Sequence, residues 1–99
     1  IYDAPMYEVL TRAKRPDTHV DLVSLPSDRP DHLEYHSYEA LVVADIVRIA
    51  RSAAQEYDGL IIGCLYDIGL PEAREVSGRA VVTAPCQSAT AIACNLARS

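Results

Sequence analysis

One stretch decides the fold that this sequence predicts: Gly59-Leu-Ile-Ile-Gly-Cys64-Leu-Tyr-Asp67-Ile-Gly-Leu-Pro-Glu-Ala-Arg-Glu75. Apolar residues 60–62 are typical of a buried strand, which leads into Cys64, a turn, and a helix with Pro71 in its first turn. Strands that alternate with helices predict an α/β fold with a parallel sheet, and such sheets bind ligands at the carboxyl ends of their strands. We therefore expect Cys64 at the edge of the sheet where ligands bind.

The other elements follow from hydrophobic periodicity and from the positions of proline and glycine. We expect seven alternating segments: helix 5–14, strand 19–25, helix 38–56, strand 59–64, helix 70–77, strand 80–84 and helix 86–98. Gly78 offers a left-handed residue that ends a helix. Sheets usually have about five or six strands, so we interpret the 99 residues as a single domain that is an incomplete part of a longer protein.

Composition and charge exclude several classes of protein. With 49% hydrophobic and 23% charged residues, the sequence is typical of a globular domain and not of a disordered one. The net charge of −5 argues against nucleic-acid binding, and no apolar run reaches the roughly 20 residues of a membrane span. The first residues lack the pattern of a signal peptide, so we expect a cytoplasmic location.

The cysteines and histidines argue against a disulfide framework and a metal site. The three cysteines, Cys64, Cys86 and Cys94, include no C-x-x-C pair, which favours reduced thiols, and we expect Cys94 in the core of the last helix. His32 and His36 lack a third ligand at useful spacing, so we predict exposed loop histidines and no bound metal. The absence of G-x-G-x-x-G, P-loop and G-x-S-x-G motifs removes the commonest nucleotide-binding and hydrolase functions.

Cys64 is the candidate catalytic residue. A thiol at a strand end just before a helix feels unpaired backbone N–H groups and the helix dipole, both of which favour the thiolate. A thiol that exchanges its proton readily is suited to general acid–base catalysis. The same position also suits a small buried hydrophobic residue, because free cysteine is among the most buried residue types. The sequence leaves both interpretations open.

A second strand-to-helix junction lies at Thr83-Ala-Pro-Cys86-Gln87, on the same edge of the predicted sheet. Asp67 is expected either to orient a substrate amide or to cap the turn into the next helix. Cys86 is a candidate for a second reactive thiol. The candidate substrate-binding residues are Gly63, Tyr66, Asp67, Thr83, Cys86 and Gln87.

Residues 57–75 and 80–85 resemble the aspartate/glutamate/hydantoin racemase superfamily, and within it the hydantoin and allantoin racemases. The run Gly-Cys-x-x-Asp-x-Gly-Leu, followed by Ala-Arg-Glu and a Val-Val strand, carries this resemblance. Ile68 stands where the family usually has proline, and Gln87 stands where it commonly has glutamate.

The resemblance implies a cofactor-independent racemase, without PLP or metal, made of two flavodoxin-like halves whose parallel sheets carry helices on both faces. In such enzymes one thiol removes the α-proton and a thiol from the other half returns a proton to the opposite face. Cys64 corresponds to the first thiol, and neither Cys86 nor Cys94 matches the motif of the second.

From this resemblance we expect residues 1–99 to be the N-terminal half of the racemase, without its first strand and inactive alone. The longer protein would act as a homo-oligomer on a small-molecule substrate that is hydantoin-like or derived from an amino acid. Decarboxylation or cis–trans isomerisation within the same superfamily is one alternative. A non-catalytic flavodoxin-like binding domain is another, and a redox sensor that pairs Cys64 with Cys86 is a third.

Overall fold

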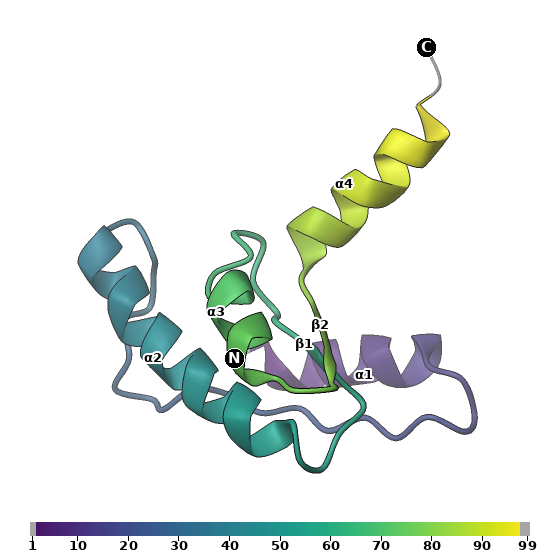
Figure 1. The fold of residues 1–99 in the computed structure, drawn as a ribbon, viewed down its shortest axis with the longest axis horizontal. Helices are drawn as coiled ribbons and strands as arrows, with labels where there is room; N and C mark the ends of the chain where they lie inside the picture. The colour runs from purple at the N-terminus through teal and green to yellow at the C-terminus, as the bar shows by residue number, and fades with distance from the viewer. Residues whose placement is uncertain (1, 98–99) are drawn as a thin grey trace.

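The computed structural model describes residues 2–97, which contain four helices and two short strands (Figure 1). Helices occur together with a small parallel two-stranded sheet, so the α/β class predicted from the sequence is confirmed. In chain order the elements are α1 Asp3–Ala13, α2 His36–Ala53, β1 Gly59–Ile61, α3 Leu70–Val76, β2 Val81–Thr83 and α4 Pro85–Leu96.

The sheet is a parallel pair joined through α3. Gly59 lies opposite Val81 and Ile61 lies opposite Thr83, so both strands end at the same edge. The predicted strands 59–64 and 80–84 are confirmed in position but are shorter, because only three residues of each take part in the ladder. Residues 62–64 continue beyond the ladder and carry the chain to the edge of the sheet.

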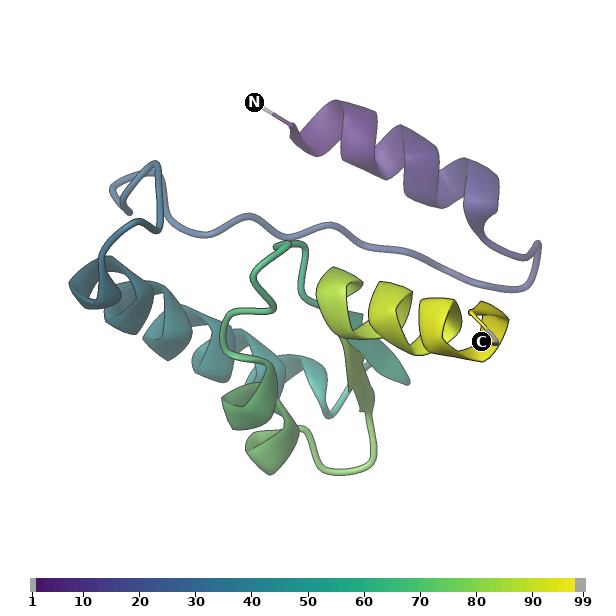
Figure 2. The same cartoon turned by 90° about the horizontal axis from the view of Figure 1, so that it is seen from above.

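The predicted strand at residues 19–25 is wrong. These residues follow an extended path, but within residues 2–97 no strand lies beside them to complete a ladder (Figure 2). Side chains hold the segment instead: the Ser24 hydroxyl donates to Asp3 of α1 at 2.6 Å, and the Tyr57 hydroxyl donates to Asp21. The second bond lowers the pKa of Asp21 and raises the pKa of Tyr57 from their ordinary values.

The core lies between α2, α3 and one face of the sheet. Helix α2 was predicted from its apolar stripe, and Val42, Ile46 and Ala50 of that stripe are buried. Helix α3 packs directly against α2, with Pro71 in its first turn as predicted (Figure 1). The buried cluster consists of Val42, Ile46, Ala50, Ile62, Leu70, Ala73, Val82 and Ala84.

The other surfaces of the domain are uncovered. Ile61 and Val81, on the opposite face of the sheet, are 64% and 70% exposed, so the predicted cover of helices on both faces is not confirmed. Helices α1 and α4 bury none of their side chains, and α4 projects away from the core (Figure 1). The expectation that Cys94 lies in the core is therefore wrong: it is exposed on α4. The predicted end of this helix at Arg98 lies outside the described residues.

The accessible surface agrees with this open arrangement. It measures 7814 Å², whereas a folded monomer of this mass exposes about 5500 Å². None of the helices within residues 2–97 combines the length and the apolar character that crossing a bilayer requires.

Glycine is required at the turn that leads from residues 62–68 into α3. Gly69 precedes α3 with a φ of 73°, and a Cβ built there would lie 3.1 Å from Cγ2 of Ile46. Gly78, which ends α3 with a φ of 57° as the sequence predicted, has no atom within 4 Å of such a Cβ. A residue with a Cβ would be strained at both positions, but it would also be crowded only at position 69.

We predict that Gly69→Ala lowers the free energy of unfolding more than Gly78→Ala does. The left-handed backbone costs each variant about 1 kcal/mol, and crowding against Ile46 adds about 1 kcal/mol more at residue 69. Urea unfolding followed by circular dichroism measures both changes. Equal losses in the two variants would show that the contact with Ile46 is unimportant.

Candidate active site

Cys64 lies where the chain leaves the sheet, at the carboxyl end of β1. Its side chain is half-buried, packs against the core cluster and lines a hollow of about 320 Å³. That volume suits a small molecule, and the thiol is not sealed away from it. The hollow is lined by Leu25, Pro30, Asp31, Leu33, Val42, Ile46, Ile49, Leu60, Ile61, Ile62, Gly63, Cys64 and Ile68.

A tight turn follows the thiol. The Cys64 N–H donates to the Ile62 carbonyl at 2.9 Å, and the Asp67 N–H donates to the Cys64 carbonyl at 3.0 Å. Asp67 adopts a φ of 52°, a left-handed conformation that aspartate tolerates better than most residues. The turn therefore reverses the chain and directs Asp67 toward the second strand-to-helix junction.

The carboxylate of Asp67 caps helix α4. One oxygen accepts the Cys86 N–H at 2.8 Å and the other accepts the Gln87 N–H at 2.6 Å. An acidic side chain at this end of a helix satisfies unpaired amide groups and complements the helix dipole. Of the two roles expected for Asp67, the structure shows the cap, but on α4 and not on the helix that follows it in sequence.

The cap occupies the first amide groups of α4. The amide groups of Cys86 and Gln87, which the sequence placed near Cys64, already donate to a carboxylate of the protein. The Gln87 side chain accepts a bond from the Arg74 guanidinium, which also donates to the Val82 carbonyl at 3.0 Å. Arg74 thus ties α3 to β2 and to the start of α4.

Four of the six predicted binding residues fall into two groups. Gly63 joins Cys64 in the hollow, whereas Asp67, Cys86 and Gln87 meet at the start of α4. The other two belong to neither group. Tyr66 is 76% exposed, and the Thr83 hydroxyl lies 2.5 Å from the Ser88 hydroxyl.

The predicted loop histidines are exposed, but His36 begins α2 and only His32 lies in the loop. Among the described residues, no cluster of three or more His, Cys, Asp or Glu side chains is arranged to hold a metal ion.

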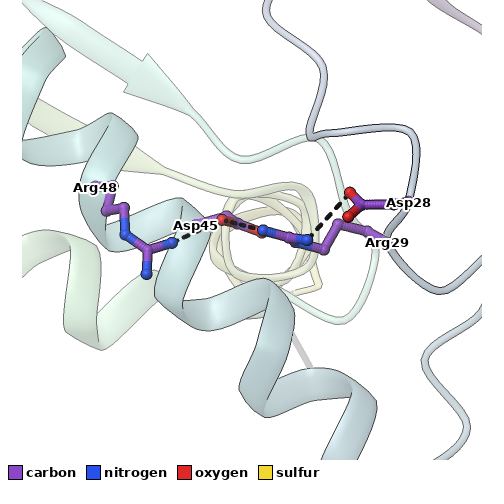
Figure 3. Close-up of polar contacts among 4 residues, drawn as sticks. All are labelled: Asp28, Arg29, Asp45 and Arg48. Carbon is purple, nitrogen blue, oxygen red and sulfur yellow. Dashed lines mark hydrogen bonds and ion pairs between the residues drawn. The ribbon is translucent and has the colours of Figure 1, made fainter.

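An ion pair that was not predicted from the sequence lies beside the hollow. Asp45 lies on the buried side of α2, and its carboxylate accepts two bonds from the Arg29 guanidinium and one from Arg48 at 2.9 Å (Figure 3). The bonds from Arg29 are the main cause of the lowered pKa of Asp45, and the same contact raises the pKa of Arg29. An acid within an apolar helical stripe is the signal that points to such a partner.

Similarity to a known protein adds to this geometry. Hydantoin racemase from Rhizobium meliloti is 36% identical to this chain over 86 residues. The match covers 86% of this chain and 35% of the racemase, so the chain spans about a third of the length of this relative. No protein-family profile and no solved structure matches the chain. The similarity supports a relationship to racemases, in agreement with the resemblance carried by residues 57–75.

We predict that Asp67→Ala lowers the free energy of unfolding by about 1 to 2 kcal/mol, because it removes the cap of α4. Hydrogen exchange of the Cys86 and Gln87 amides, measured by NMR, should become faster. Asn95→Ala, further along the same helix, is the control and should leave that exchange unchanged. Unchanged amide exchange in Asp67→Ala would contradict a capping role.

We predict that the stabilising effect of Asp45 disappears in acid. Its folded pKa lies below the unfolded value, so its contribution is complete above pH of about 4 and is lost as the pH falls through the folded pKa. The difference in unfolding free energy between the wild type and Asp45→Asn should therefore shrink as the pH is lowered. Urea unfolding at several pH values measures it. A difference that stays constant would show that the charge of Asp45 is unimportant.

Proposed function

We propose that this chain supplies one of the two thiol acid–base groups of a cofactor-independent racemase. The substrate is hydantoin-like or derived from an amino acid, and its stereocentre lies beside a carbonyl group. The observation that carries the proposal is the position of Cys64, half-buried in a hollow at the carboxyl edge of a parallel sheet. The similarity to hydantoin racemase supports the same chemistry.

The reaction requires a proton to leave one face of a carbon atom and another to arrive on the opposite face. The neighbouring carbonyl acidifies the C–H bond by delocalising the negative charge that develops. The Cys64 thiolate takes this proton, or the Cys64 thiol supplies one in the reverse direction. The aliphatic wall of the hollow limits the access of water to the carbanion, which protects it from uncontrolled protonation.

The second thiol would come from the remainder of a longer protein. Cys86 and Cys94 are both exposed, and neither lines the hollow that contains Cys64. We assign Gly63 to close backbone approach of the substrate, and Tyr66, Thr83 and Gln87 to the rim of the completed site. Asp67 supports this rim by capping α4. The complete enzyme is proposed to be a homo-oligomer without a cofactor.

The test uses the full-length protein and each enantiomer of a 5-substituted hydantoin in D₂O. Replacing Cys64 with serine should lower racemisation by about 100-fold to 10,000-fold, because one acid–base group is lost. Exchange of the C5 proton should continue with one enantiomer only, since the other thiol still reaches its own face. Polarimetry measures racemisation, and mass spectrometry measures deuterium in the recovered substrate.

Two controls accompany this experiment. The full-length Cys94→Ser variant should racemise normally, because this thiol is exposed on α4. The isolated 99-residue chain should show no turnover. Undiminished racemisation in Cys64→Ser would contradict the proposal. With a dicarboxylate or an unsaturated acid in place of the hydantoin, loss of carbon dioxide or a change in double-bond geometry would instead indicate a decarboxylase or an isomerase.

A further inference from the structure

The Arg29–Asp45 ion pair lies on the buried, largely apolar side of α2. The Asp45 side chain is 8% exposed and the Arg29 side chain is 30% exposed, so both have lost much of their contact with water. Removing such charges from water is costly, and an ion pair of this kind is weak evidence for stability alone. In the paired geometry both carboxylate oxygens of Asp45 bind one guanidinium, which fixes how Arg29 is oriented relative to α2 (Figure 3).

The pair connects the two walls of the hollow beside Cys64. Arg29 belongs to the proline-containing loop and is followed directly by Pro30 and Asp31, which line the hollow. Asp45 belongs to α2, which lines the hollow through Val42, Ile46 and Ile49.

The loop is also stiff near the ion pair. The Arg29 N–H donates to the Pro26 carbonyl at 3.1 Å, which closes a turn, and the prolines on both sides of this segment restrict its backbone. A movement of Arg29 therefore displaces the adjoining wall of the hollow with it.

We propose that Arg29 is a positioning residue whose contact with Asp45 holds the loop of residues 25–33 against α2 and thereby controls the access of small molecules to Cys64. This role deepens the proposed function of Cys64. Its test measures access to the sulfur atom and needs no turnover, so it stands or fails separately from the racemase assignment.

Arg48 provides the matched control. It binds the same carboxylate at 2.9 Å, but from within α2, three residues further along the helix. Its side chain is 71% exposed and holds no part of the loop. Replacing Arg48 therefore removes a charge from Asp45 and leaves the connection between the two walls in place.

The experiment compares alkylation of Cys64 by a small reagent, iodoacetamide, and a bulky one, fluorescein maleimide. Trypsin separates Cys64 from the other thiols, because Arg74 and Arg79 lie between them, and mass spectrometry follows each peptide. In Arg29→Gln we expect Cys64 to react about tenfold faster with the bulky reagent and less than about threefold faster with the small one. Arg48→Gln should match the wild type, and Arg29→Lys should fall between Arg29→Gln and the wild type because it keeps the charge but not the paired contact.

Urea unfolding of the same variants, followed by circular dichroism, measures any loss of overall stability. Cys86 and Cys94 are already exposed, so they serve as internal standards for the intrinsic rate of each reagent. Unchanged reactivity of Cys64 in Arg29→Gln would overturn the proposal. Acceleration of Cys64 by the same factor with both reagents, matching the loss in unfolding free energy, would also overturn it, because the pair would then stabilise the fold without controlling access. Acceleration confined to Cys64 and larger for the bulky reagent supports it, whether or not the full-length protein racemises hydantoins.

Discussion

The carboxylate of Asp67 is the contact on which the rest of the edge depends. It receives two backbone N–H groups from the start of α4, although it belongs to the turn that follows β1. One side chain thus connects the segments that follow β1 and β2, and it fixes the turn that begins at Cys64. The left-handed conformation of Asp67 strains its backbone, and the two charge-assisted hydrogen bonds of its carboxylate offset the energetic cost of that strain.

This contact also limits the chemistry that the site can offer. The first amides of α4 serve the protein's own carboxylate, so they are not available to bind a substrate anion. Among the described residues that line the hollow, Asp31 is the one with a charged side chain, and it is negative. Within the proposed function, residues 2–97 therefore contribute a thiol and an aliphatic wall, which suit an uncharged ring better than a free carboxylate. A carboxylate substrate would need a cation from another part of the protein.

Local patterns were predictable from the sequence, and contacts between distant residues were not. Helix α2 follows from apolar residues at helical spacing, and the place of Cys64 at the edge of the sheet follows from a strand that ends just before it. The strand expected at residues 19–25 failed because a ladder needs a neighbour, which no property of the segment itself supplies. Cys94 was misplaced for the same reason, since its helix finds no surface to cover it within residues 2–97. The helix that Asp67 caps begins 18 residues later, and Arg29 lies 16 residues from Asp45.

The absence of a strand at residues 19–25 bears on the role proposed for the Arg29–Asp45 ion pair. A sheet would have held residues 19–25 through backbone hydrogen bonds, but here exposed side-chain contacts to Asp3 and Tyr57 hold them. Exposed contacts of this kind contribute little to stability, so the segment leading to the hollow is weakly held. Beyond it, Leu25 and Leu33 pack against the core only in part, and Arg29 reaches a buried carboxylate. Few contacts hold the wall opposite α2: the paired Arg29–Asp45 contact, the partial packing of Leu25 and Leu33, and the His32 ring beside Tyr38 of α2. The role proposed for Arg29 follows from this small number of contacts.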